Sequence, residues 1–179
     1  MYATLHRMIA IVVATDKNGA IGRANRIPWH IRSDFIRLAN LTRGKTVIVG
    51  RRSYESMVWY YNKSGKKMPG NCYIVVTRDT TYTPAHDNAR VAHSIAEALA
   101  ISQSLGEEVY VIGGGSIFAA ALPAADRIYL TEVQTKLDGN VDAYFKIPDM
   151  SQWHEIAREH HQKNEHDEYD TEVITLEKI

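Results

Sequence analysis

Short apolar runs alternate with amphipathic stretches along most of this chain, which is the pattern of an α/β fold. The nearly continuous apolar runs predict strands that are buried on both faces of a sheet. We expect these strands at 8–14, 46–50, 72–77, 109–112 and 128–133. The stretches between them predict helices at 33–41, 51–58, from 94 to near 106, and at 116–122. Short strand–helix–strand connections imply a mainly parallel sheet with right-handed crossovers and helices on both faces.

Local signals mark where some of these helices begin and end. Ser33 is the expected N-cap of the first helix, because a serine hydroxyl can accept a hydrogen bond from the first turn. Ser94 and Glu97 have the spacing of a capping box, and Pro123 closes the helix that starts at 116. The connection at 59–69 is basic and aromatic, and we expect it to form a long loop.

The C-terminal part is more polar, and its apolar residues alternate with polar ones. This period of two predicts antiparallel strands at 153–159 and 171–176, separated by a charged turn. Such strands would close one edge of the sheet. We therefore expect a single α/β domain over residues 8–179, preceded by a short extension at 1–7.

Charge and composition limit the function classes. The 179 residues include 21 Lys plus Arg and 21 Asp plus Glu, so the formal net charge is zero, which argues against a general nucleic-acid binder. The single cysteine, Cys72, excludes an internal disulfide and fits a reducing compartment. No apolar run approaches the length of a membrane span, and residues 1–7 lack the apolar core of a signal peptide. A cytoplasmic protein is expected.

Asp34 is the strongest single candidate for a catalytic or ligand-binding residue. It follows Pro28 and Trp29 and stands beside Phe35 and Leu38, so a lone carboxylate would face apolar side chains at the start of a helix. Such an acid can bind a flat, nitrogen-rich ring through paired hydrogen bonds and help to draw a proton onto that ring. The alternative is an ordinary first-turn acid that interacts with the helix dipole.

Two further sets of residues indicate an anion site. Gly113–Gly115 lie between a buried strand and a helix, where backbone N–H groups can approach a pyrophosphate, although the same glycines could form a plain tight turn. Four polar residues follow the carboxyl ends of two other strands, where ligands bind in open α/β sheets: Arg51, Arg52, Thr77 and Arg78. If these strands are neighbours, the guanidinium groups suit a phosphate monoester. Each arginine alone could instead be a solvated surface residue.

The remaining reactive residues carry weaker signals. The histidines near the C-terminus lack metal-ligand spacing, so no metal site is expected among His154, His160, His161 and His166. Cys72 begins a strand and fits a buried structural thiol better than a nucleophile. No serine has the surroundings of a nucleophile elbow.

Taken together, these segments resemble dihydrofolate reductase over nearly the whole length from Met8 to Ile179. The motifs that carry the resemblance are Ala14, Ile21-Gly22, Ile27-Pro28-Trp29 through Asp34, Gly50 to Ser56, Thr77-Arg78, Val111 to Gly115, and Tyr129-Leu130-Thr131. Their order and spacing make the match specific. The resemblance implies a mixed, mainly parallel sheet of about eight strands flanked by helices. It also implies hydride transfer from NADPH to C6 of the pteridine of 7,8-dihydrofolate, with protonation at N5.

The resemblance also assigns roles to residues of this chain. Catalysis would rest on Asp34, Trp29 and Thr131, and the loop at 16–26 would close over the nicotinamide. The substrate would be bound by Val12, Ile27, Asp34, Phe35, Leu38, Met57, Ile112 and Thr131. NADPH would be bound by Ala14, Ile21, Gly22, Gly50, Arg51, Arg52, Ser53, Thr77, Arg78, Ile112, Gly114, Gly115, Ser116, Ile117 and Phe118. A cis peptide often joins the glycines at 113 and 114, and the residues near the adenosine 2′-phosphate favour NADPH over NADH.

One departure from the family bears on the substrate. The family usually has an arginine that binds the α-carboxylate of the glutamate tail, and this chain has Asn71 there. A charged hydrogen bond contributes about 1.5–3 kcal/mol, so affinity would fall roughly tenfold or more unless another cation replaces it. The candidate replacements are Lys63, Lys66, Lys67, Arg32 and Arg37. Phe118 is a smaller departure, at a position where many members have Tyr.

Two other functions stay open beside dihydrofolate reduction. The first is NADPH-dependent reduction of a pterin or pyrimidine without the glutamate tail. Asn71 supports this alternative, because it replaces the arginine that would bind the tail. The second is a catalytically silent homologue that binds ligands, against which the retention of Asp34, Trp29 and Thr131 argues. The expected partner is the small-molecule substrate dihydrofolate, bound by a monomer that interacts with neither nucleic acid nor membrane.

Overall fold

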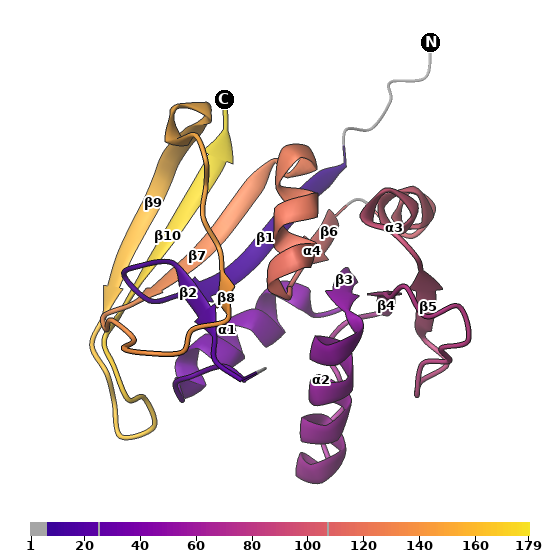
Figure 1. The fold of residues 1–179 in the computed structure, drawn as a ribbon, viewed down its shortest axis with the longest axis horizontal. Coiled ribbons are helices and arrows are strands. Elements are labelled where there is room, and N and C mark those ends of the chain that lie inside the picture. The colour runs from indigo at the N-terminus through magenta and orange to yellow at the C-terminus, as the bar shows by residue number, and fades with distance from the viewer. Residues whose placement is uncertain (1–6, 25, 107) are drawn as a thin grey trace.

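An eight-stranded sheet forms the centre of the protein in the computed structural model, which describes residues 7–24, 26–106 and 108–179. Residues 1–6 of the expected extension therefore lie outside the described residues. The strand order is β5-β4-β3-β6-β1-β7-β10-β9 (Figure 1). The strands are β1 (Met8–Thr15), β3 (Thr46–Gly50), β4 (Cys72–Val76), β5 (Ala89–Ala92), β6 (Glu108–Val111), β7 (Arg127–Val133), β9 (Trp153–His161) and β10 (Thr171–Lys178).

The sheet is parallel apart from the edge that the C-terminal hairpin forms. From β5 to β7 every described pair of neighbours is parallel, whereas β10 runs antiparallel to both β7 and β9. The predicted α/β class, with a mainly parallel sheet closed by antiparallel strands, is confirmed.

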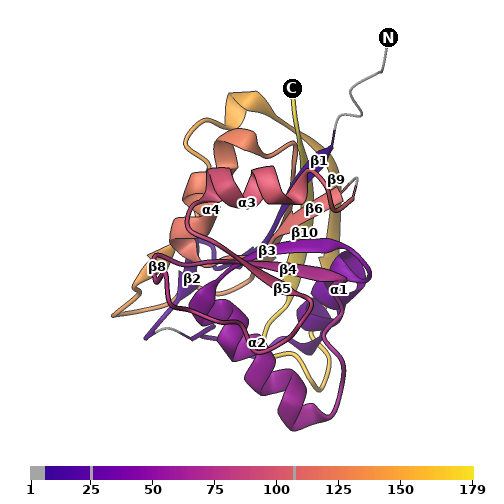
Figure 2. The same cartoon turned by 90° about the vertical axis from the view of Figure 1, so that its right-hand side faces the viewer.

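Helices cover both faces of this sheet (Figure 2). They are α1 (Arg32–Thr42), α2 (Arg51–Ser64), α3 (Ile95–Ser102) and α4 (Gly115–Ala121), with 3-10 turns at Leu122–Ala124 and Met150–Gln152. The helices α1 and α2 lie on one side, and α3 and α4 lie on the other. No helix in the described ranges is long and apolar enough to cross a membrane.

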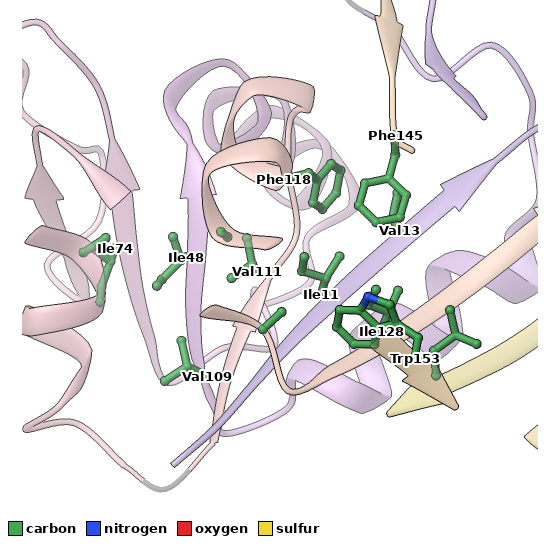
Figure 3. Close-up of a cluster of buried hydrophobic side chains, with 14 of the residues drawn as sticks. Ile11, Val13, Ile48, Ile74, Val109, Val111, Phe118, Ile128, Phe145 and Trp153 are labelled. Carbon is green, nitrogen blue, oxygen red and sulfur yellow. The ribbon is translucent and has the colours of Figure 1, made fainter. Parts of the chain in front are cut away.

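Each face has its own apolar core. Ile48 of β3 belongs to the cluster on the side of α4, together with Phe118 (Figure 3). Val47 and Val49 belong to the opposite cluster, with Tyr54 of α2. Because neighbouring residues of a strand point to opposite faces, a strand buried on both sides needs apolar residues at every position. This is why the apolar runs located the central strands well.

The beginning of α1 differs from the prediction. The residue before the helix is Ile31, and Ser33 lies inside the first turn rather than at the N-cap. The Ser33 hydroxyl donates to the carboxylate of Asp167 instead. In contrast, the predicted cap of α3 is confirmed, since Ser94 Oγ accepts the N–H of Glu97 at 3.1 Å.

The helix α2 is longer than predicted. It runs to Ser64 and ends at Gly65, whose φ of +66° turns the chain out of the helix. The expected loop at 59–69 therefore begins with about two further helical turns. Its aromatic residues lie on a helix beside α1, where the ring of Tyr60 stacks with that of Phe35 at 6.3 Å.

The chain that leaves β1 is tied to a small second sheet that the sequence did not reveal. This sheet pairs β2 (Ala20–Gly22) with β8 (Ala143–Tyr144). The buried carboxylate of Asp16 holds the turn, because it accepts N–H groups from Ala20 and Leu137 at 2.8 Å each. A side chain at Gly19 would lie 2.7 Å from the carbonyl of Phe145, so the close approach requires glycine.

Candidate active site

Asp34 and Thr131 meet where α1 passes β7. Asp34 lies in the first turn of the helix, and Thr131 lies within the strand. The Thr131 hydroxyl donates a hydrogen bond of 2.6 Å to Asp34 Oδ1. Thr131 is buried, whereas the side chain of Asp34 keeps 24% of its surface exposed. The acid therefore stands at the border between the core and solvent, where a ligand could reach it.

The surroundings of Asp34 act on its pKa in opposite directions. Burial is the largest influence and raises the pKa, and the nearby charge of Asp167 raises it further. The hydrogen bond from Thr131 and the charge and hydrogen bond of Arg37 lower it. The pKa remains above its ordinary value of 3.8, which is typical of an acid in a functional site.

The segment before α1 fixes where this acid stands. Trp29 and Ile31 are buried in a cluster with Val133 of β7, and Ala14 packs against that cluster. Trp29 is therefore a firmly held core residue just upstream of Asp34. Ile27, in contrast, is 54% exposed.

The expected substrate residues largely share the α1 and α2 side of the sheet. Ala14 is paired in register with Thr131, and Val12 points the same way because it is two residues earlier in β1. Met57 of α2 and Ile112, just after β6, both pack against the cluster of this face. Two further residues come from α1, namely Phe35, which is 39% exposed, and Leu38, which is partly buried.

The glycine turn after β6 lies against the end of β3. The Gly50 N–H donates to the Gly113 carbonyl at 2.7 Å, and the peptide between Gly113 and Gly114 is cis, as expected. A Cβ at Gly50 would lie 3.1 Å from Ile117, and one at Gly113 would lie 3.1 Å from the ring of Phe118. Residues with a side chain at positions 50 and 113 would therefore not fit where the end of β3 meets the turn after β6.

Other expected cofactor residues converge on the same turn. A Cβ at Gly114 would be 3.7 Å from Ser53 Oγ, and one at Gly115 would be 3.6 Å from Ile21 Cδ1. Ser53 at the start of α2, Ile21 of β2 and the exposed Ser116 thus surround glycines that carry no side chains. This cradle suits a pyrophosphate. Gly22 is buried in β2, and Phe118 is buried against Phe145.

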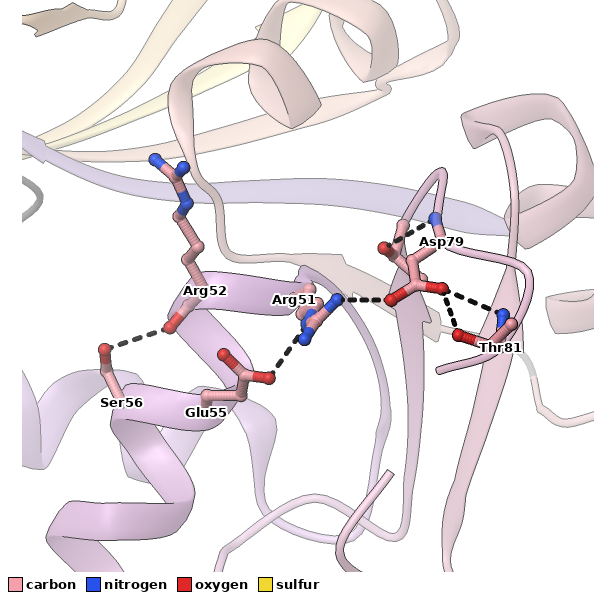
Figure 4. A network of polar contacts seen from close by, with 7 residues as sticks. Arg51, Arg52, Glu55, Ser56, Asp79 and Thr81 are labelled. Atoms are coloured by element: carbon pink, nitrogen blue, oxygen red, sulfur yellow. Dashed lines mark hydrogen bonds and ion pairs between the residues drawn. The ribbon is translucent and has the colours of Figure 1, made fainter. Parts of the chain in front are cut away.

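Two of the expected phosphate arginines, Arg51 and Arg52, point in different directions (Figure 4). Arg51 donates to Glu55 Oε1 at 2.9 Å and to Asp79 Oδ2 at 2.8 Å, while Arg52 points away from it (Figure 4). Thr77 Oγ1 accepts the N–H of Asp79, and the exposed Arg78 follows it. The parallel pairing of β3 with β4 does bring these residues to one edge, as predicted.

The sequence did not indicate the partners of two charged residues, Arg51 at the end of β3 and Asp34 in α1. Glu55 lies four residues after Arg51, a spacing that signals a helical ion pair, but nothing in the sequence links Asp79 to it. Arg37, one of the candidates for the glutamate tail, forms an ion pair with Asp34. Within the described residues no group of three or more His, Cys, Asp or Glu side chains could hold a metal ion.

Known proteins resemble the chain over nearly its whole length. A profile of the dihydrofolate reductase family matches residues 8–178. Dihydrofolate reductase type 3 of Salmonella typhimurium is 36% identical over 169 residues, covering 94% of this chain and 97% of that protein. The enzyme of Staphylococcus haemolyticus is 32% identical over 171 residues, covering 96% of each. Dihydrofolate reductase from Enterococcus faecalis, solved with NADP(H) and RAB-propyl, aligns with a TM-score of 0.81 at 27% identity over 96% of each chain.

These matches agree with the observed fold. The residues that the family profile matches, 8–178, include the whole eight-stranded sheet and its antiparallel edge. The predicted α/β fold, enzyme class and cofactor are confirmed. The chain belongs to the dihydrofolate reductase family, whose reaction is the NADPH-dependent reduction of dihydrofolate.

Proposed function

We propose that Asp34 is the acid that binds and activates dihydrofolate in this chain. Its carboxylate would accept hydrogen bonds from N3 and the 2-amino group of the pteridine, and its charge would favour protonation at N5. Thr131 would hold the carboxylate in place and reach the ring through water. The single observation that carries this proposal is the 2.6 Å bond between Thr131 and a largely enclosed acid.

NADPH, when bound, supplies the hydride that goes to C6 of the pteridine. On this chain, Ala14 and Ile21 would position the carboxamide of the nicotinamide, and the loop at 16–26 would exclude water from it. The glycine cradle would face the pyrophosphate, through Gly22, Gly50, Ser53, Gly114, Gly115, Ser116 and Ile117, beside Ile112 and Phe118. The 2′-phosphate would bind at the β3 and β4 edge, at Arg51, Arg52, Thr77 and Arg78.

The substrate would lie on the α1 and α2 side of the sheet. Its apolar surroundings would be Val12, Ile27, Phe35, Leu38, Met57 and Ile112, and Trp29 would anchor a water near the ring. These residues supply no proton, so their role is to orient the pteridine for hydride transfer. We further propose that residues 8–179 form the whole catalytic domain of a cytoplasmic monomer, with a small-molecule substrate and no nucleic acid or membrane partner.

The first test is NADPH oxidation with 7,8-dihydrofolate and with a dihydropterin that lacks the glutamate tail. Faster turnover of dihydrofolate supports the proposal and requires another cation in place of the missing arginine. Preference for the tail-less compound would instead favour the alternative function, the reduction of a pterin or pyrimidine without the glutamate tail. That alternative rests on Asn71, an exposed and uncharged residue whose carbonyl accepts a hydrogen bond from Asn88.

Asp34→Asn tests the assignment of the acid. The amide keeps the shape of the carboxyl group but cannot carry its charge. Turnover at neutral pH should fall by about 10²-fold or more, while NADPH binding, followed by fluorescence, stays unchanged. Substantial residual turnover would show that another residue activates the substrate.

A further inference from the structure

Arg37 lies one helical turn beyond Asp34 and folds back onto it. Arg37 Nη1 is 3.0 Å from Asp34 Oδ1 and 3.3 Å from Thr131 Oγ1. The i, i+3 spacing puts both side chains on the same side of α1. Asp34 Oδ1 thus accepts from a hydroxyl and from a guanidinium, whereas Oδ2 has no hydrogen bond within the described part of the chain.

The charges that surround the acid come from different elements. Arg37 acts from the same helix and favours the ionised carboxylate, as does the Thr131 hydroxyl from β7. Asp167 acts from the loop between β9 and β10 and disfavours the ionised form, as burial does. Within the described residues, Arg37 is thus the cation whose charge lowers the pKa of Asp34, whereas burial raises it.

The pairing is only partly shielded from water. The side chains of Arg37 and Asp34 keep 23% and 24% of their surfaces exposed. A guanidinium in such a position can hold a carboxylate by charge and by a directed hydrogen bond without itself being locked in the core. Solvent screening keeps the effect modest.

We propose that Arg37 is a positioning residue for the reduction, because its guanidinium favours the ionised form of the Asp34 carboxylate and fixes Oδ1 while Oδ2 stays open to the ligand. The inference rests on the proposed function for its link to dihydrofolate. An ionised acid is the form that favours protonation of the pteridine, so Arg37 would extend activity toward lower pH.

The direct test is a pH titration of the aspartate carboxyl carbons by NMR in the full-length protein, with the Asp34 signal assigned from its loss in Asp34→Asn. Arg37→Gln should make Asp34 titrate at higher pH, whereas Arg37→Lys should stay near the parent protein. Arg43→Gln is the charge-matched control, since Arg43 follows the same helix roughly 13 Å along its axis from Asp34. Arg43→Gln should move the titration much less.

Activity gives a second readout. On the acidic limb of the pH profile, kcat/KM of Arg37→Gln should fall about threefold or more below that of Arg37→Lys, and the two should converge at high pH. If the substitution only disturbed the structure, kcat/KM would fall on both the acidic and the basic limb of the pH profile. Arg37→Met, which keeps an apolar stem, serves as the second variant if glutamine perturbs α1.

Two results would overturn the inference. One is an Asp34 titration in Arg37→Gln that matches the parent, and the other is an equal shift in Arg43→Gln, which would assign the effect to the overall charge of the helix. If the parent protein fails to reduce dihydrofolate, the proposed function fails, but the NMR titration still decides whether Arg37 controls the acid.

Discussion

The carboxylate of Asp167 accepts the backbone N–H of Ser33 at 3.0 Å, although the two residues are 134 positions apart in the chain. Asp167 also accepts from the Asn164 side chain at 2.9 Å, which keeps its loop in shape. The helix that carries Asp34 is therefore capped by the C-terminal hairpin rather than by its own sequence. This makes the hairpin part of the support of the candidate active site.

Asp167→Ala should destabilise the protein by about 1–2 kcal/mol, the usual effect of losing a helix cap. It should also lower kcat, because the first turn of α1 loses its anchor. Urea unfolding and steady-state kinetics measure the two effects. Asp170→Ala is the matched control, since Asp170 accepts the N–H of Lys163 in the same loop. Equal losses of kcat in both variants would contradict a role for the cap.

The stabilisation by Asp167 should depend on pH. Burial raises its pKa, but the hydrogen bonds from Ser33 and from the backbone of Arg32, together with the charge of His166, outweigh burial and leave the pKa below the ordinary value. The stabilisation is therefore present above the unfolded-state pKa and is lost as the pH falls through the folded-state pKa. The gap in unfolding free energy between the parent and Asp167→Ala should narrow in acid.

Thr131→Val should weaken catalysis by removing the hydroxyl that bonds to Asp34. A hydrogen bond to a charged group is worth about 1.5–3 kcal/mol, so kcat/KM should fall roughly tenfold or more. Because this bond lowers the pKa of Asp34, its loss should also move the acidic limb of the profile to higher pH. Thr131→Ser keeps the hydroxyl and should retain most activity; similar profiles for both variants would rule out the bond as the cause.

Asp34→Asn should make the ligand-free protein more stable at neutral pH. Folding raises the pKa of Asp34, so its favourable contribution exists below the unfolded-state pKa and disappears as the pH rises through the folded-state pKa. A neutral amide avoids placing that charge in the site. We therefore expect a higher Tm than that of the parent protein at neutral pH. Thermal melts at several pH values check this, and an increase that persists in acid would contradict it.

Arg51→Gln should weaken NADPH far more than NADH. Glu55 and Asp79 hold the guanidinium at the end of β3, where the 2′-phosphate is expected. Loss of a charged hydrogen bond should raise KM for NADPH about tenfold or more. Arg158→Gln makes the same charge change on β9, where Arg158 pairs with Glu155. Parallel losses with both cofactors would place the phosphate elsewhere.

The central sheet could be predicted because burial on both faces forces uninterrupted apolar runs. The predicted and observed bounds of β3 agree, and β1 differs by a single residue, Thr15. Family resemblance, rather than periodicity, singled out Asp34 and Thr131 as a pair. Their contact joins residues 97 positions apart, and nothing in the local pattern specifies it.

Two of the errors share one physical cause, which is that distant contacts replaced local signals. Ser33 has the chemistry of an N-cap, but Asp167 supplies the cap, so the hydroxyl became a donor. The small sheet of β2 and β8 depends on a turn held by Asp16 and Leu137, residues 121 positions apart. The length of α2 was missed because its last turns are polar and aromatic, without a clear apolar stripe.

The distant cap on α1 also bears on how the enzyme is made. During synthesis, β1, β3, β4 and β6 can emerge and pair before the residues around Asp167 leave the ribosome. The nascent chain can thus acquire much of its parallel sheet while the helix bearing Asp34 still lacks its anchor. Contacts between such distant residues slow folding. Competence for folate chemistry therefore arrives as one of the last steps of biogenesis, after most of the scaffold is in place.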